Sequence, residues 1–499
     1  MTNAIAAFVQ ALDIGQLVPE RYAAYRSLVA EALAFFLDRL PASRRTALLA
    51  DQLSLATFAT LAERVVAVMR QCPTLHKLGQ LIARDRRLAP DFRAQLQTLE
   101  SLPSTIPAQE ILETIQREVG RSDITVIPRT IAEASVAVVV PFAWRERPGA
   151  PRQDGVFKVL KPGVEGRLTE ELQIWAAVAE FLAERTRKYG LPVLECQEML
   201  DQVRDLLASE IHLDREQAHL AEAARLYAGN RAVLIPRLFP FSTSRLTAME
   251  RVDGRKVTDV TGSEARRRLG NLIVQALVAT PFWSEAGTSM FHADPHAGNL
   301  LLTGDDRLAI LDWSLVGHLN KAAREHLMQV LLGALTLDPA RICEAARRLS
   351  ARPSGPAASQ AVVAAALAEL RRGAFPGFEW LVGLLDRLAV AGAAGFPADL
   401  LFFRKALLSV SGVVADVDSA TALDENLLQA GLAQFFREFF SRAGASPDFR
   451  GFGTHVSNAD LLGLWASWPL TALRLWLGLW QDSLEGSRTH EMVPNPAAA

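Results

Sequence analysis

The stretch FHADPHAGNLLLTGDDRLAILDWSLVG, residues 291–317, gathers several polar residues beside two apolar runs. The two runs flank a Gly-Asp-Asp turn at 304–306, and this arrangement predicts a β-hairpin. Asp294 stands before the expected hairpin and Asp312 stands after it. The choice of metal ligands within this stretch separates two kinds of chemistry, zinc-dependent hydrolysis and magnesium-dependent phosphotransfer.

A zinc site would use His292, Asp294 and His296, which alternate in the sequence and would share one face of a strand. Histidine and carboxylate are good zinc ligands. However, Pro295 and Gly298 favour a loop, and no further His-rich segment is present. A role limited to stabilising a turn would leave the concentration of polar residues beside an apolar hairpin unexplained. We therefore favour the phosphotransfer interpretation.

Phosphotransfer would use Asp294, Asn299 and Asp312. Asn299 follows Asp294 after five residues, and Asp312 follows after another thirteen. The spacing Asp-x-x-x-x-Asn is that of the protein-kinase catalytic loop, where Asp meets the substrate hydroxyl and Asn binds magnesium. A hairpin then returns the chain so that a second Asp can bind magnesium, which prefers oxygen ligands.

This interpretation requires a lysine on an earlier strand, and the segment GVFKVLKPG (155–163) provides Lys158 between apolar residues. Lys158 would contact the α- and β-phosphates of a nucleotide. We expect Lys161, beside a Pro-Gly pair, to face solvent.

A glycine-rich phosphate loop is replaced by TIAEASVAVVV (130–140). Glycine lets backbone amides approach phosphates closely, whereas the Cβ atoms of Ala132, Ala134 and Ala137 restrict that approach. A standard protein kinase is therefore a poor fit.

Together these motifs resemble the UbiB (AarF-type) atypical protein-kinase-like family over most of residues 70–420. The resemblance rests on a Lys-x-Gly-Gln motif, an alanine-rich loop, a lysine strand, a Glu-x-Asp helix, a hinge strand, a catalytic loop and a late helix. In this chain the corresponding segments are KLGQ (77–80), IAEASVAVV (131–139), FKVLKPGVEGRL (157–168), LASEIHLDREQAHL (207–220), LTAMERVDG (246–254), FHADPHAGNLLL (291–302) and FPADLLFFRKALLSVSGVVADVD (396–418).

The resemblance implies that Lys158 binds phosphates, that Asp294 is the catalytic-loop aspartate, and that Asn299 and Asp312 bind Mg²⁺. It also implies that Glu210 pairs with a lysine, either Lys158 or Lys77. In this family the Lys-x-Gly-Gln helix lies over the cleft and disfavours ordinary protein phosphorylation. Further nucleotide contacts are expected from Ala134, Ser135, Lys77, Gln80 and the hinge residues Glu250 to Val252, which would meet adenine.

The chain departs from the family pattern at three places. His212 replaces the second carboxylate of Glu-x-Asp, Ala297 replaces a proline, and Asp312-Trp313-Ser314 replaces Asp-Phe-Gly. Loss of the carboxylate changes the local charge balance, which leaves open a pseudokinase that binds nucleotide as a scaffold. An aminoglycoside- or choline-type phosphotransferase is the other alternative. That group is similar in its His-x-Asp loop and Asp-Trp pair, but it lacks the Lys-x-Gly-Gln helix.

Composition bounds the function further. The 499 residues include 53 Lys and Arg against 55 Asp and Glu, a net charge of −2, so we expect no nucleic-acid partner. The three cysteines are far apart and form no Cys-x-x-Cys pair, which favours a reduced intracellular protein. The N-terminus lacks the pattern of a secretory signal.

One segment, DLLGLWASWPLTALRLWLGLWQD (460–482), has about the 20 residues needed to span a bilayer. Arg474 opposes insertion, whereas Trp465, Trp468, Trp476 and Trp480 could anchor an interfacial helix. The helix could span the membrane, lie on it or dock on the protein.

We therefore expect an α+β, protein-kinase-like two-lobed fold. The expected parts are an N-terminal helical extension (1–107), an N-lobe (108–255), a C-lobe (256–425) and a helical tail (426–499). The expected function is that of a Mg-dependent ATPase or kinase, or an accessory factor in isoprenoid-quinone or lipid metabolism, with ATP or ADP and Mg as cofactors. The expected partners are a nucleotide and a lipid or quinone precursor, with a membrane, a homodimer or a biosynthetic complex to be tested. The expected location is cytoplasmic, with peripheral or single-span attachment at the inner membrane as the alternatives.

Overall fold

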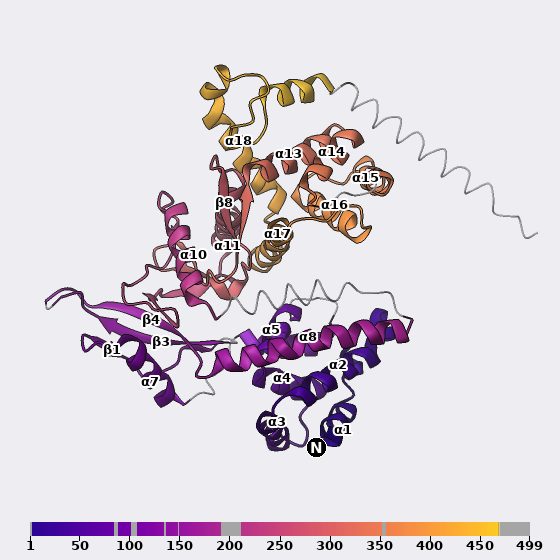
Figure 1. The fold of residues 1–499 in the computed structure, drawn as a ribbon. Coiled ribbons are helices and arrows are strands. Elements are labelled where there is room, and N and C mark those ends of the chain that lie inside the picture. Colours follow the sequence, from indigo (N-terminus) through magenta and orange to yellow (C-terminus); the bar gives the residue numbers. More distant parts are fainter. Residues whose placement is uncertain are drawn as a thin grey trace, which may run out of the picture. The chain divides into compact units, whose positions relative to one another are not determined.

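The computed structural model describes residues 2–83, 88–100, 107–133, 136–147, 149–190, 211–351, 356–467 and 469. The chain divides into two compact units (Figure 1). Unit 1 comprises Met1–Ala224 with Pro236–Val252, and unit 2 comprises Arg225–Ile235 with Asp253–Ala499. The predicted mixed α+β, kinase-like fold class is confirmed, with N-terminal helices, a β-sheet and a mostly helical C-terminal region.

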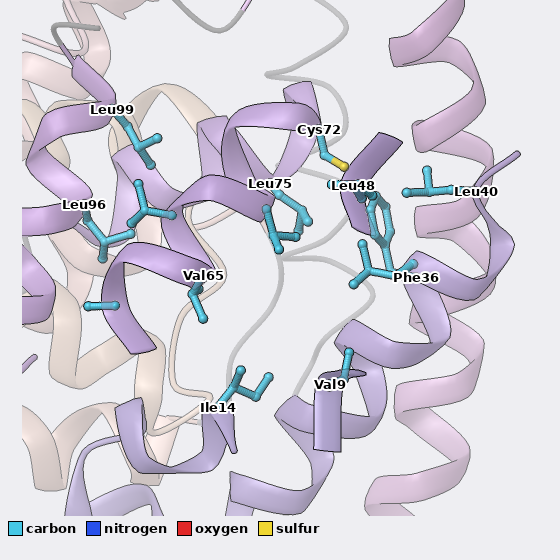
Figure 2. Close-up of a cluster of buried hydrophobic side chains, with 14 of the residues drawn as sticks. Val9, Ile14, Phe36, Leu40, Leu48, Val65, Cys72, Leu75, Leu96 and Leu99 are labelled. Carbon is cyan, nitrogen blue, oxygen red and sulfur yellow. The ribbon is translucent and has the colours of Figure 1, made fainter. Parts of the chain in front are cut away.

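Unit 1 begins with helices, which are α1 (Thr2–Leu12), α2 (Arg26–Arg39), α3 (Ala42–Ser54), α4 (Leu61–Gln71), α5 (Pro73–Ile82), α6 (Pro90–Gln97) and α7 (Ala108–Val119). Figure 2 shows buried side chains of this region, among them Phe36 and Leu96, packed in one cluster. The long helix α8 (Val164–Lys188) adds Ile174 to the cluster and packs against α2 and α5. Pro73 and Pro90 begin their helices because the N–H that proline lacks has no intrahelical partner there.

The sheet of unit 1 is antiparallel and has the strand order β1-β3-β4-β6, with β2 paired to β3. Its strands are β1 (Ile124–Val126), β2 (Ala132–Glu133), β3 (Ala137–Trp144), β4 (Gln153–Leu160) and β6 (Leu246–Glu250). The consecutive valines of β3 suit an extended strand, because β-branched side chains pack well in a sheet. Gly155 of β4 lies against the ring of Phe142. A Cβ at this position would be 2.3 Å from the ring, so the close packing requires glycine. In the register of β4, Lys158 lies between Val139 and Thr247.

The next described helix after α8 is α10 (Leu213–Leu226). The end of α10 lies in unit 2. The strand β5 (Val233–Leu234) has only two residues. It pairs in parallel with β10 (Leu308–Ile310) of unit 2, so it does not join the sheet of unit 1.

Unit 2 contains the predicted hairpin, formed by β9 (Leu300–Thr303) and β10 in antiparallel pairing. Together with β5 and β7 (Gly254–Lys256) the hairpin forms one sheet, and β8 (Thr288–His292) pairs with β11 (Val316–Asn320) in another. The helices of unit 2 are α11 (Ser263–Val274), α12 (Thr280–Phe282), α13 (Lys321–Leu335), α14 (Pro339–Leu349), α15 (Pro356–Arg371), α16 (Phe378–Val390), α17 (Ala398–Val417) and α18 (Leu423–Ala443).

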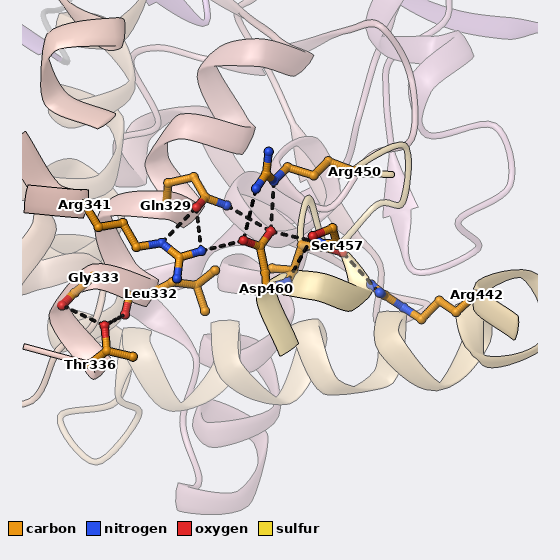
Figure 3. A network of polar contacts seen from close by, with 10 residues as sticks. Gln329, Leu332, Gly333, Thr336, Arg341, Arg442, Arg450, Ser457 and Asp460 are labelled. Carbon is orange, nitrogen blue, oxygen red and sulfur yellow. Dashed lines mark hydrogen bonds and ion pairs between the residues drawn. The ribbon is translucent and has the colours of Figure 1, made fainter. Parts of the chain in front are cut away.

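A buried polar network joins the end of the described chain to α13 and α14 (Figure 3). The Asp460 carboxylate accepts hydrogen bonds from Arg341 at 2.5 Å, from Arg450 at 2.8 and 3.0 Å and from Gln329 at 3.1 Å. Burial alone would raise the pKa of Asp460, but bonds from Arg450 and Ser457 hold that pKa below its usual range. The network fixes the start of the helical residues 458–467 on unit 2.

Most of the segment 460–482, which the sequence indicates as a possible membrane helix, lies outside the described residues. Within the described part of the chain, no helix is long and apolar enough to cross a membrane.

Candidate functional site

The loop that follows β8 carries the predicted catalytic aspartate, and His292 fixes its conformation. The His292 ring is buried, its Nδ1 accepts a hydrogen bond from the Asp294 amide at 3.1 Å, and its Nε2 lies 3.2 Å from the Leu311 carbonyl oxygen. Because Nδ1 accepts, Nε2 carries the proton and donates to Leu311. Burial lowers the pKa of His292 and favours this neutral form. The histidine therefore connects the loop to the segment just before Asp312.

Asn299 makes a second connection between the same segments. Its side-chain Nδ2 donates to the Asp294 backbone carbonyl oxygen at 3.4 Å. The backbone carbonyl oxygen of Asn299 accepts from the Leu311 amide at 2.8 Å. Asp294, Asn299 and Asp312, which the sequence predicted as one site, are thus brought together within unit 2.

Asp312 has a positive φ of 50°, a conformation that is uncommon outside glycine. The Ser314 amide donates to Asp312 Oδ1 at 3.2 Å and supports this turn. Trp313 is fully buried, its Nε1 donates to the Ile310 carbonyl oxygen at 3.1 Å, and its ring centre lies 4.9 Å from that of His292. Trp313, which stands where the family has Phe, therefore fills the core of unit 2 and packs on the histidine that orients the loop.

Helix α17 contacts the predicted catalytic loop at Asp294 and Pro295. Lys405 Nζ lies 3.2 Å from Asp294 Oδ1, and Ser409 Oγ donates to the Pro295 carbonyl oxygen at 3.3 Å. Sequence reasoning missed Lys405, although the residue lies in the late segment that resembles the family.

In unit 1, Lys158 is buried on β4, and its Nζ lies 2.8 Å from both carboxylate oxygens of Glu216 on α10. Sequence reasoning also missed Glu216. The sequence does contain a pattern that indicates Glu216: it lies on the same helical face as Leu213 and Leu220. Charged residues are rarely buried on an apolar face without a partner. Glu210 lies outside the described residues, so its predicted pairing with Lys158 or Lys77 stays a prediction.

The expectation that Lys161 faces solvent is wrong. Its Nζ lies 2.7 Å from Glu133 Oε1, and the two side chains are 15% and 3% exposed. Burial lowers the pKa of Lys161. The Lys161 amide donates to the Val136 carbonyl oxygen at 2.8 Å, so Lys161 contacts the alanine-rich loop at both Glu133 and Val136. Ala134 and Ser135 themselves lie outside the described residues.

The Lys-x-Gly-Gln motif lies on α5, where Lys77 is partly exposed. Gln80 Nε2 donates to the Leu99 carbonyl oxygen at 2.9 Å. Gly79 packs closely against the same residue, since a Cβ there would lie 2.5 Å from Leu99 Cδ1. The motif thus fixes α5 on the following segment of unit 1, and the predicted nucleotide contacts of Lys77 and Gln80 stay predictions.

The predicted hinge begins at the end of β6. The Glu250 amide donates to the Arg237 carbonyl oxygen at 2.8 Å, and the Arg251 amide donates to the Asp154 carbonyl oxygen at 3.2 Å. Val252 is the last residue of unit 1. The adenine contact expected of this segment stays a prediction.

The donor set in unit 2 fits magnesium. Asp312 offers a carboxylate and Asn299 an amide oxygen, and Mg²⁺ is commonly bound by one or two protein groups plus phosphates and water. Among the residues that the structure describes, no group of three or more His, Cys, Asp or Glu could hold a metal ion.

Comparisons with known proteins show which proteins the chain is similar to. Residues 123–346 match the family model of the ABC1 atypical kinase-like domain. The chain is 28% identical over 293 residues to an uncharacterized aarF domain-containing protein kinase, chloroplastic, of Arabidopsis thaliana, covering 54% of this chain and 50% of the relative. It is 26% identical over 282 residues to a probable protein kinase UbiB of Aeromonas hydrophila, again covering 54% and 50%.

The chain thus spans about half the length of these curated relatives. The solved complex of Rv3197 with erythromycin, from Mycobacterium tuberculosis, is similar with a TM-score of 0.47 and 17% identity, over 63% of this chain and 80% of that chain. The resemblance predicted from the sequence is confirmed: residues 123–346 form an ABC1 atypical kinase-like domain, and the chain has distant relatives among the UbiB and aarF domain proteins.

Proposed function

We propose that this chain binds ATP or ADP together with Mg²⁺ and acts as a magnesium-dependent ATPase or kinase. The observation that carries the proposal is the convergence of Asp294, Asn299 and Asp312 in unit 2. Two independent connections to Leu311, one from His292 and one from Asn299, hold them there. The membership of an atypical kinase-like family supports the same activity.

Each residue has a proposed task. Asn299 and Asp312 hold Mg²⁺, which when bound neutralises phosphate charge. Asp294 orients the attacking hydroxyl or water. Lys158 contacts the nucleotide phosphates, and Glu216 keeps its ammonium group in a fixed position.

We further propose a lipid or quinone precursor as the phosphoryl acceptor or regulated substrate, with membrane association through the C-terminal segment. The family resemblance supports this proposal. So do Leu462 and Trp465, which are 65% and 80% exposed at the end of the described helix. Carbonate extraction of membranes should release a chain that ends at Ser467 more readily than the intact chain. The cut lies beyond Asp460 because that residue belongs to the buried network of unit 2. Equal release of both chains would refute the membrane proposal.

The enzymatic proposal is tested with nucleotide binding and hydrolysis by the intact chain, with and without Mg²⁺. We expect Asp312→Asn to lower hydrolysis by about 100-fold or more, since it removes a magnesium ligand. Lys158→Ala should weaken nucleotide binding. Asp305→Asn is the matched control, because Asp305 is an exposed carboxylate on the turn of the same hairpin.

The outcomes separate the possible functions. Absence of nucleotide binding by the wild type would overturn the proposal. Binding without hydrolysis would identify a nucleotide-dependent scaffold. Phosphorylation of a small alcohol would identify a small-molecule phosphotransferase, whose Asp-Trp pair this chain shares.

A further inference from the structure

Helix α17 holds the catalytic loop at two points on one face. Lys405 contacts the Asp294 carboxylate at 3.2 Å, and Ser409, one turn later, donates to the Pro295 carbonyl oxygen. Residues four apart lie on the same side of a helix. The same helix also packs on β8, where the ring centres of Phe403 and Phe291 lie 5.3 Å apart. The position of Lys405 at the loop is therefore supported by several independent contacts.

The loop itself has no basic residue with a permanent charge. The residues between Asp294 and Asn299 are Pro-His-Ala-Gly. The His296 Nδ1 accepts from the Gly298 amide, and its Nε2 lies 4.0 Å from Asp294 Oδ2. Imidazole changes its charge near pH 6.5, whereas a lysine ammonium stays charged well above neutral pH. A permanent positive charge at this loop comes from Lys405.

Transfer of a phosphoryl group places negative charge on its three equatorial oxygens, and enzymes stabilise this charge with positioned cations. The Lys405 side chain is 34% exposed, so solvent-borne ligands can reach it. An ammonium group has three N–H donors. Contact with Asp294 therefore does not prevent Lys405 from donating to a phosphate oxygen as well.

We propose that Lys405 contacts the terminal phosphate of a nucleoside triphosphate, with Asp294 holding its ammonium group in place. This inference rests on the proposed function, because it assumes that unit 2 binds Mg-nucleotide. Lys405 would then belong to the nucleotide site. The chain would bind the triphosphate more tightly than the diphosphate, because only the triphosphate has the terminal phosphate that Lys405 contacts.

A simpler role for Lys405 is to neutralise Asp294 and fix α17. The two roles differ in nucleotide selectivity. A cation that touches the terminal phosphate affects triphosphate binding more than diphosphate binding, whereas a lysine that only supports the loop affects both nucleotides equally.

The test measures the dissociation constants of Mg-ADP and of magnesium with a non-hydrolysable ATP analogue, using the intact chain. We expect Lys405→Met to weaken binding of the ATP analogue by about 10- to 100-fold, the range for a charge-assisted hydrogen bond. Binding of Mg-ADP should change by less than about 3-fold. Lys405→Arg should restore most of the selectivity, because it keeps the charge. Lys405→Gln serves as a second neutral variant if Lys405→Met does not fold.

Arg404→Met is the matched control. Arg404 is the neighbouring cation on α17 and pairs with Asp386 of α16, so its removal should leave both dissociation constants unchanged. Ser409→Ala removes the other contact of α17 with the loop and should not change the ratio of the two constants.

Equal weakening of both nucleotides by Lys405→Met, or no weakening, would show that Lys405 has only a supporting role and would overturn the inference. A wild type that binds neither nucleotide would overturn the proposed function instead. The two failures are therefore distinguishable.

Discussion

Replacement of Glu216 by glutamine should destabilise unit 1 strongly. The side chains of Lys158 and Glu216 are only 10% and 6% exposed, and the lysine ammonium contacts both carboxylate oxygens. Loss of one partner of a buried ion pair typically costs about 3–5 kcal/mol, because the remaining charge is left in a poorly solvated place. For a unit of 150–250 residues this corresponds to a decrease of roughly 6–20 °C in Tm.

Removal of both charges should be less harmful than removal of one. We expect the double variant Lys158→Met with Glu216→Leu to recover at least half of the lost stability, because apolar residues of similar size avoid the desolvation cost. The single variants Lys158→Met and Glu216→Leu each change the free energy of unfolding. The difference between the change in the double variant and the sum of these two changes is the coupling energy, which should exceed about 2 kcal/mol.

Thermal unfolding of the intact chain measures the change, and hydrogen exchange in peptides from β4 and α10 assigns the transition to unit 1. Asp214→Asn is the control, because Asp214 is 60% exposed on the same helix and should change stability by less than about 0.5 kcal/mol. A decrease in Tm below about 2 °C for Glu216→Gln, or simple additivity in the double variant, would refute the reasoning.

Three further predictions concern unit 2. Burial lowers the pKa of His455 from 6.5 to about 4, so stability that is complete above pH 6.5 should fall by about 3 kcal/mol as the pH decreases to 4. Denaturation at several pH values should show this fall in the wild type and a smaller one in His455→Asn; identical profiles would contradict it. Gly317→Ala should cost about 1–3 kcal/mol by overpacking, since a Cβ there would lie 2.2 Å from the Phe291 ring. Gly304→Ala, which meets open space, should cost less, and equal Tm changes for the two variants would exclude this explanation. Asp460→Asn should lower the free energy of unfolding of unit 2 by about 2–3 kcal/mol in urea titrations, and an unchanged midpoint would show that its two arginines are held by other contacts.

Much of the site in unit 2 could be predicted from the sequence because its parts are close along the chain. The hairpin from β9 to β10 forms between neighbouring segments, and its turn residues and apolar runs specify it locally. That hairpin brings Asn299 and Asp312 to the same end, which the spacing alone indicated. The strand that carries Lys158 was visible for the same reason, since its short apolar run and its Pro-Gly end are local signals.

The charges that surround these residues could not be predicted in the same way. Lys158 meets Glu216, Lys161 meets Glu133, and Asp294 meets Lys405, and in each pair the partners come from different elements. Helical periodicity shows which face of α10 or α17 is buried, but it does not show which residue lies opposite.

The sequence by itself therefore determined the fold class, the resemblance to the ABC1/UbiB family and the closeness of Asn299 and Asp312, which a short hairpin links. Only the tertiary structure decided which cations and carboxylates pair at the site and that Lys161 packs against Glu133 instead of facing solvent. The physical reason is that local backbone preferences depend on neighbouring residues, whereas ion pairing depends on how separate helices and strands pack.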